Sequence, residues 1–141
     1  MNTNKFILSG IAGGVVFFLL GWLFYGMLFA NFFMEHAGPA KGVTRAADHM
    51  LLLYIALGNF LFGFLLAYVI SKAGITTVTS GTMTSAIVGF LVSSSYNSVS
   101  YGTTWISSRT SIVVDIAVFT ATSAIAGAIV AWVAGMGKKT S

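Results

Sequence analysis

Cysteine is absent from this chain, which excludes disulfide bonds, thiolate metal ligands and thiol catalysis. Charged side chains are scarce as well, at 7% of the residues, whereas soluble domains carry about 25%. Most of the surface therefore cannot face water. The seven basic residues are scattered and form no patch, so we expect no nucleic-acid partner. Composition does not change along the chain, which predicts a single transmembrane domain over residues 1–141.

Hydrophobic residues make up 57% of the chain and gather into four long segments. A spanning helix needs about 20 mainly apolar residues, and the first segment is also too long for the apolar part of a signal peptide, about 7–15 residues. The third segment is rich in Ser and Thr, which a membrane helix tolerates where neighbouring helices cover the hydroxyls, so we expect a helix that is mostly buried in protein. The sequence predicts an all-α integral membrane four-helix bundle, with four transmembrane helices at about residues 6–33, 50–70, 76–101 and 112–134.

Basic residues flank the four segments unevenly. The side of the two termini carries Lys5, Lys72, Lys138 and Lys139, and the opposite side carries Lys41, Arg45 and Arg109. By the positive-inside rule this excess predicts an N-in/C-in membrane protein. All three acids and both histidines fall on the second side, so that side holds nearly every residue capable of acid–base or ligand chemistry.

Small side chains recur every four residues in each segment, which places them on one face of a helix. In the third segment they are Gly81, Ser85, Gly89, Ser93 and Asn97. Small side chains let membrane helices approach closely, so we interpret these stripes as contacts inside the bundle. A second interpretation is that one stripe serves a homo-oligomer or a partner subunit.

The fourth segment has an alanine stripe, which includes Ala117 and Ala121, on the face opposite Asp115. If Asp115 faces the bundle, the alanines face outward and are free for a partner. If the alanines face inward, a partner or the membrane interface must cover the carboxylate.

Asp115 is the strongest single candidate, because an acid within a membrane helix is a functional hypothesis by default. A structural interpretation is about as strong: the carboxylate could pair with Arg109 or bond to Tyr96, Asn97 or Tyr101. These residues belong to or border the stretch SSSYNSVSYGTT (93–104), which we expect to form a polar collar near Asp115. Its first half should continue the third helix, and Gly102-Thr103-Thr104 should leave it. Asn59, in the middle of the second segment, either bridges helices or contacts a transported species, and bridging is favoured.

Two acid–histidine pairs, Glu35-His36 and Asp48-His49, flank the loop after the first segment. Carboxylate and imidazole are ligands for zinc or iron, but this spacing matches no established metal motif. Thr44 as a helix N-cap, with Arg45 paired to Asp48, explains the loop without a metal. We favour that structural interpretation and predict no metal and no cofactor.

A family resemblance adds to this interpretation. The stretch GWLFYGMLF (21–29) resembles the G-x-x-W-Y-x-x-x-F signature of small bacterial four-helix membrane proteins catalogued as a domain of unknown function, family 1761. Two later groups are similar: Gly89-Phe90 with Asn97, and Val114-Asp115 with Gly127-Ala128-Ile129. Phe24 stands where the family usually has Trp, and Asp115 where it often has Asn. The resemblance implies the architecture and no activity.

No nucleophile–base pair is recognisable, so we expect no enzyme. The sequence predicts a non-enzymatic accessory subunit that contacts membrane lipid and packs against itself or other membrane proteins. The alternative is a small transporter or channel with a polar cavity lined by the third helix, Asn59 and Asp115.

Overall fold

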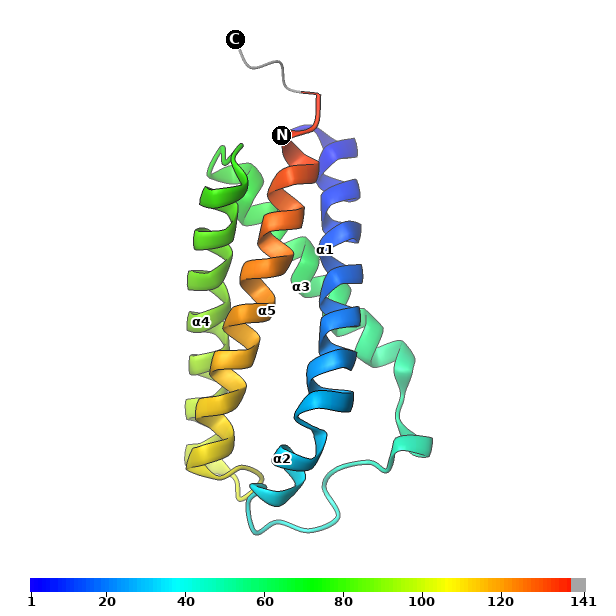
Figure 1. Cartoon of the computed structure of the whole chain (residues 1–141), viewed down its shortest axis with the longest axis vertical. Helices are drawn as coiled ribbons and strands as arrows, with labels where there is room; N and C mark the ends of the chain where they lie inside the picture. The colour runs from blue at the N-terminus through cyan, green and yellow to red at the C-terminus, as the bar shows by residue number, and fades with distance from the viewer. Residues whose placement is uncertain (138–141) are drawn as a thin grey trace.

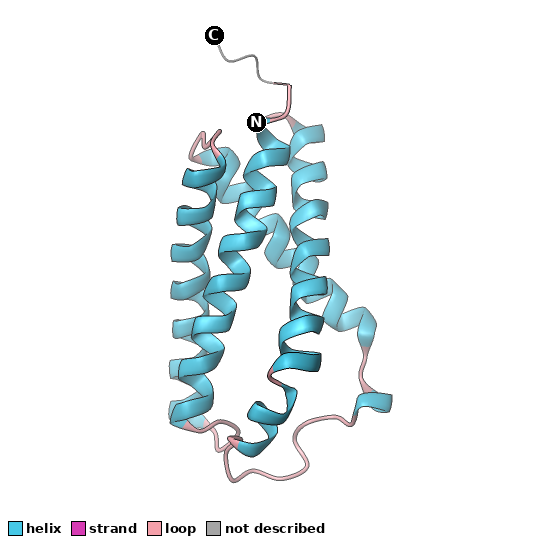
Figure 2. Ribbon diagram, in the orientation of Figure 1, coloured by secondary structure: helices cyan, strands magenta, loops and turns pink. Residues whose placement is uncertain are grey.

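The computed structural model describes residues 1–137, and within that range the chain is helical with no β-strand. Its elements are α1 (Thr3–Leu23), the π-helical turn η1 (Phe24–Leu28), α2 (Ala30–Glu35), the short 3-10 helix η2 (Ala47–His49), α3 (Leu52–Lys72), α4 (Val78–Thr103) and α5 (Arg109–Gly135). The long helices α1, α3, α4 and α5 form the body of the molecule (Figure 2). Lys138 and Lys139, which enter the orientation argument, lie outside the described residues.

The prediction of one continuous helix over residues 6–33 is wrong. The α-helix ends at Leu23, the next turn is a π-helix, and Phe29 leaves helical geometry at φ −111° and ψ 7°. The Phe29 amide donates to the Phe24 carbonyl at 2.8 Å, a bond over five residues that widens the turn. A continuous apolar run does not reveal such a break, because hydropathy does not report backbone phase.

The loop that follows also differs from its predicted capping. Thr44 caps no helix: η2 begins after Ala46 and α3 after Leu51, neither of which provides a side-chain cap. Asp48 lies 3.4 Å from the neighbouring His49 ring instead of pairing with Arg45.

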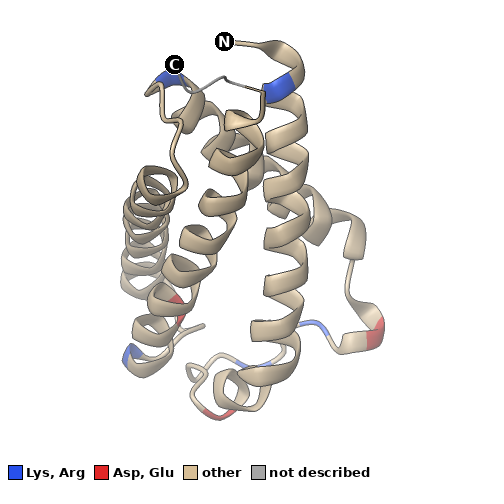
Figure 3. Cartoon of the chain, turned by 45° about the horizontal axis from the view of Figure 1, so that its top comes forward, with Lys and Arg blue, Asp and Glu red and all other residues tan. Residues whose placement is uncertain are grey.

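Three helical segments are long and apolar enough to cross a membrane: Thr3–Leu28, Leu52–Lys72 and Arg109–Gly135. The helix α4 has 26 residues, about 39 Å at 1.5 Å per residue, and its Ser and Thr content keeps it outside this group. Both described ends of the chain lie at one end of the helices (Figure 1), where the Lys5 ammonium donates to the Met136 carbonyl at 2.5 Å. The ribbon segments coloured as acidic in Figure 3 lie away from that end.

Two helix pairs build the body, α1 with α3 and α4 with α5, and α1 also packs along α5. The two pairs meet at a triangle of phenylalanine rings contributed by three helices. Phe17 lies 4.7 Å from Phe62 and 5.6 Å from Phe119 between ring centroids, and Phe62 lies 4.9 Å from Phe119. This cluster joins α1, α3 and α5 near the middle of the molecule.

Glycines set the distance between α1 and α3. A β-carbon added at Gly63 would overlap the Gly14 backbone and lie 2.7 Å from the Gly10 carbonyl oxygen. Backbone atoms cannot move aside as a flexible side chain can, so this crossing requires glycine.

The α4–α5 pair uses the predicted stripe. Its five members are the five buried residues of α4, and they face α5. A β-carbon at Gly81 would meet Ala131 and the Gly127 carbonyl, and one at Gly89 would meet Ser123. The expectation that the third helix is mostly covered by protein is wrong, however, because Met83, Ile87 and Leu91 on its other faces are exposed.

The first half of α3 diverges from its neighbours, as Figure 1 shows. The buried residues of α3 all lie in its second half, from Gly63 to Ile70, whereas Leu52, Leu53 and Tyr54 are exposed by 64%, 78% and 68%. At the end away from the termini, the molecule is therefore a three-helix arrangement with one side open.

At that same end, the loop after α2 is hydrogen-bonded to the loop between α4 and α5. Gly38 donates to the Ile106 carbonyl at 2.8 Å and Ala40 donates to the Trp105 carbonyl at 3.0 Å. A β-carbon at Gly38 would lie 2.7 Å from the Ile106 carbonyl carbon, so the close contact again requires glycine. These bonds fix the end of α2 against the start of α5.

We expect Gly63→Ala to destabilise the protein by about 1–3 kcal/mol, since the added methyl group must force α1 and α3 apart. Gly58→Ala is the matched control, because a β-carbon there has no atom within 4 Å. The control should be neutral or stabilising by up to about 1 kcal/mol through helix propensity. Thermal unfolding in mild detergent measures both, and equal melting temperatures for the two variants would contradict the packing argument.

Candidate functional site

Asp115 lies in the second turn of α5, about 9 Å along the axis from Arg109. The helix begins with a capping box in which Ser108 and Ser111 exchange side-chain-to-backbone bonds, and this fixes where α5 starts. The Asp115 side chain is half-buried and faces α1 and α4. The carboxylate thus faces the bundle, but the alanine stripe faces outward only near its start, because its later member Ala131 is fully buried against Gly81 of α4.

The first hydrogen bond to Asp115 comes from the other half of the chain. The Tyr25 hydroxyl donates to Oδ1 of Asp115 at 2.6 Å, a short distance of the kind seen when the acceptor is charged. Tyr25 lies in the π-helical turn η1, and single π turns inside α-helices are frequent at functional sites. The π-helical turn, which the sequence did not predict, thus contributes a hydrogen-bond donor to the carboxylate.

The other donors come from α4. The Asn97 amide donates to Oδ2 of Asp115 at 2.7 Å, and the Ser93 hydroxyl approaches the same oxygen at 3.4 Å. The Asn97 amide also donates to the Ser93 carbonyl at 2.9 Å, which holds it in place. The predicted contact between this collar and Asp115 is confirmed for Asn97, and the last two members of the α4 stripe form the polar end of the α4–α5 interface.

No positive charge neutralises Asp115 among the described residues. The predicted pairing with Arg109 is wrong, because the Arg109 guanidinium donates from Nε to the Tyr101 hydroxyl at 3.2 Å instead. Within residues 1–137 the Asp48–His49 contact is the one ion pair. The carboxylate is therefore held by neutral donors alone.

Two cavities border Asp115. One of about 250 Å³ lies toward the loop between α4 and α5 and includes Phe33, Asn97 and Ser111 in its lining. The other, of about 320 Å³, lies deeper and includes Ser93 and Phe119. Tyr25 and Tyr96 line both, so two tyrosine side chains flank the carboxylate on its open sides.

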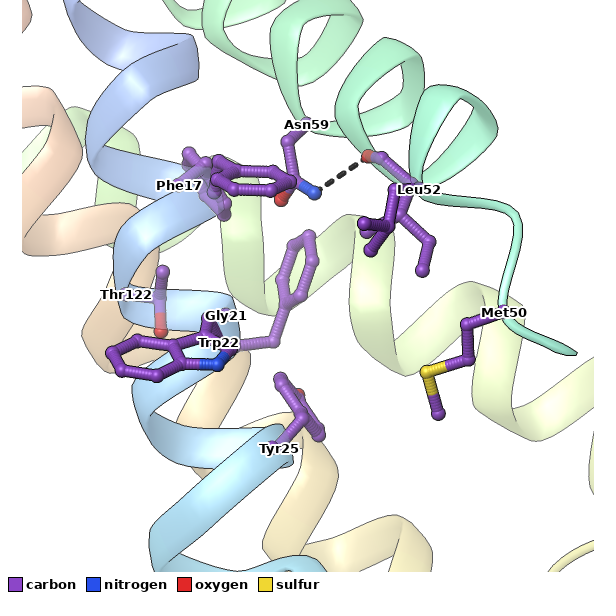
Figure 4. Close-up of a pocket in the computed structure, with 12 residues that line it drawn as sticks. Phe17, Gly21, Trp22, Tyr25, Met50, Leu52, Asn59 and Thr122 are labelled. Carbon is purple, nitrogen blue, oxygen red and sulfur yellow. Dashed lines mark hydrogen bonds between the residues drawn. The ribbon is translucent and has the colours of Figure 1, made fainter. Parts of the chain in front are cut away.

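A third cavity, of about 310 Å³, occupies the space left by the diverging half of α3 (Figure 4). Its lining is mainly apolar and includes Trp22, Ile55 and Phe119, with Asn59 at one wall. It shares Tyr25 and Phe119 with the deeper Asp115 cavity, so these two side chains border both spaces.

The other predicted residues are placed as follows. Tyr96 is 71% exposed and lines the cavities but makes no hydrogen bond to Asp115, and Tyr101 contacts Arg109 instead. Asn59 lies in the apolar cavity rather than beside Asp115, and its amide donates to the Ile55 carbonyl of its own helix at 2.7 Å. The transporter alternative predicted one polar cavity lined by both Asn59 and Asp115. Among the described residues, these two side chains line different cavities.

The four acid–histidine candidates stay dispersed. His36 stacks on Phe32 at 4.2 Å between ring centroids, and its carbonyl accepts the Ser108 hydroxyl. Glu35 is exposed, and Asp48 and His49 are exposed on η2. No three Asp, Glu, His or Cys residues in the described part of the chain are grouped so that they could hold a metal ion.

One contributor to the site, Tyr25, was absent from the predicted residues, whereas Ser93 belongs to the predicted collar and to the four-residue stripe that ends at Asn97. No local signal indicated Tyr25, because it is 90 positions away from Asp115 and its local sequence is that of an interfacial aromatic.

A double-mutant cycle tests whether Tyr25 and Asp115 are coupled. We expect Tyr25→Phe and Asp115→Asn to be non-additive in unfolding free energy by about 1 kcal/mol, because Tyr25→Phe removes the donor of this hydrogen bond and Asp115→Asn removes the charge that strengthens it. The matched control pair is Tyr96→Phe with Asp115→Asn, which should be additive within about 0.5 kcal/mol. Additivity in the Tyr25 cycle, measured in mild detergent, would contradict the bond.

In comparisons with known proteins, no protein-family model matches this chain, and no curated protein or solved structure is significantly similar to it. The resemblance to the bacterial four-helix family therefore stays a prediction.

Proposed function

We propose that this protein is an integral membrane protein with four spanning helices, α4 being the fourth, and that it acts as a non-enzymatic accessory subunit in a homo-oligomer or a larger membrane complex. The length of α4 supports a fourth span, because 26 residues reach across a hydrocarbon core of about 30 Å. Its burial of Ser93 and Asn97 against α5 also supports it, since these polar groups are covered.

The observation that carries the subunit proposal is the outer face of α5. Asp115 faces the bundle, and Ala117 and Ala121 are exposed on the opposite face. Exposed Val113 and Ile125 extend the same four-residue spacing. Small residues at this spacing let a second helix approach closely, which is the main source of helix association in lipid.

A second candidate function, transport of a small solute, is favoured by one specific observation. An acid within a membrane helix borders two cavities, and no cationic side chain in the described chain occupies them. The two functions are compatible, because the cavities and the alanine face lie on different sides of α5.

Membrane topology can be measured directly because the chain has no native cysteine. In intact cells, single cysteines at Thr44 and Thr104 should react with an impermeant maleimide, and those at Thr3 and Thr76 should not, if the termini are cytoplasmic. Thr44 and Thr104 on opposite sides would contradict a spanning α4. Reaction only at Thr3 and Thr76 would reverse the proposed orientation and leave the four spans intact.

We expect native mass spectrometry from mild detergent to find the protein as a homo-oligomer or with a co-purifying subunit. Ala121→Leu should reduce that association at least tenfold, because the larger side chain prevents close helix contact. Gly58→Leu on α3 is the matched control, since space is open there and α5 is not involved. A strictly monomeric wild-type protein would contradict the subunit proposal, as would an Ala121→Leu variant that associates normally.

A further inference from the structure

We propose that the Asp115 cavities, together with the apolar cavity that shares Tyr25 and Phe119 with the deeper of them, bind an organic ammonium cation with an apolar substituent. The ammonium group lies against Asp115, and the substituent lies in the cavity between α1 and α3. This inference rests on the site of the transport candidate but requires only binding.

The first argument is the direction of the hydrogen bonds. Tyr25, Asn97 and Ser93 all donate to the carboxylate, so their donor groups are already used. What remains toward the cavities is a negative charge with free lone pairs. A ligand that offers N–H groups or positive charge is favoured there, and an anion is repelled.

The second argument is the chemistry of the walls. Tyr25, Tyr96 and Phe33 line the outer Asp115 cavity, and Phe119 lines the deeper one. Aromatic rings attract cations through their negative faces, and this is how proteins recognise alkylammonium groups. An aromatic enclosure around a carboxylate suits an organic cation better than a metal ion, which needs several oxygen or nitrogen ligands.

The third argument is the apolar cavity on the same two side chains. That space of about 310 Å³ shares Tyr25 and Phe119 with the deeper Asp115 cavity, and Trp22 and Phe18 extend its apolar lining. Figure 4 shows Trp22 and Tyr25 on one wall and Asn59 on another. A cation without an apolar substituent would leave this volume unused, so the ligand is amphipathic.

Isothermal titration of the purified full chain in mild detergent tests the proposal, with phenethylammonium as the probe. We expect phenethylammonium to bind at least tenfold more tightly than 2-phenylethanol, its neutral analogue, and at least tenfold more tightly than methylammonium, which lacks the ring. Equal affinity for phenethylammonium and 2-phenylethanol would overturn the role of the charge, and no binding of phenethylammonium would overturn the site.

Variants distinguish the contribution of the carboxylate from that of the apolar cavity. Asp115→Asn should weaken phenethylammonium binding at least tenfold, whereas Asp48→Asn, which removes an exposed acid of the loop, should not change it. Gly21→Leu, which fills the apolar cavity, should weaken phenethylammonium and leave methylammonium unchanged. Full binding by Asp115→Asn would overturn the proposal, and the analogue comparison on wild-type protein decides the matter if that variant does not fold.

Liposome flux of phenethylammonium is a separate readout. Binding without flux would remove the transport function and leave the site in place. Because oligomeric state is measured independently, failure of the subunit proposal and failure of this site are distinguishable.

Discussion

Close approach of helix backbones is the constraint on which the rest of this structure depends. Lipid solvates apolar side chains as well as another helix does, so membrane helices associate through van der Waals contact and polar bonds. At Gly63 the backbones of α1 and α3 leave no room for a β-carbon, and at Gly81 and Gly127 the same holds between α4 and α5. These two crossings determine how the four long helices are positioned and therefore which side chains meet.

One consequence is the position of the carboxylate. Because the small stripe of α4 packs against α5 down to Asn97, the amide arrives beside Asp115. Because α1 packs along α5, its irregular π turn brings Tyr25 to the other oxygen. An acid that would be costly in lipid is thus held by three helices of one chain, and its charge remains available to a ligand.

A second consequence is the open side of the molecule. The α1–α3 crossing lies in the second half of α3, so its first half diverges and leaves the apolar cavity beside the site. Tyr25 and Phe119 then border both a polar and an apolar space. The location of the glycines thus places an apolar cavity near the carboxylate.

The sequence by itself determined the all-helical class, the four long segments and the α4 stripe, because hydropathy and four-residue spacing are local properties of the chain. It also indicated Asn97 as a neighbour of Asp115, since both lie near the same loop. The break at Phe29, the divergence of α3, the separation of Asn59 from Asp115 and the Tyr25 bond were decided only by the tertiary structure. Each depends on how helices far apart in sequence cross, and side-chain volumes at the crossing, rather than any local pattern, determine that geometry.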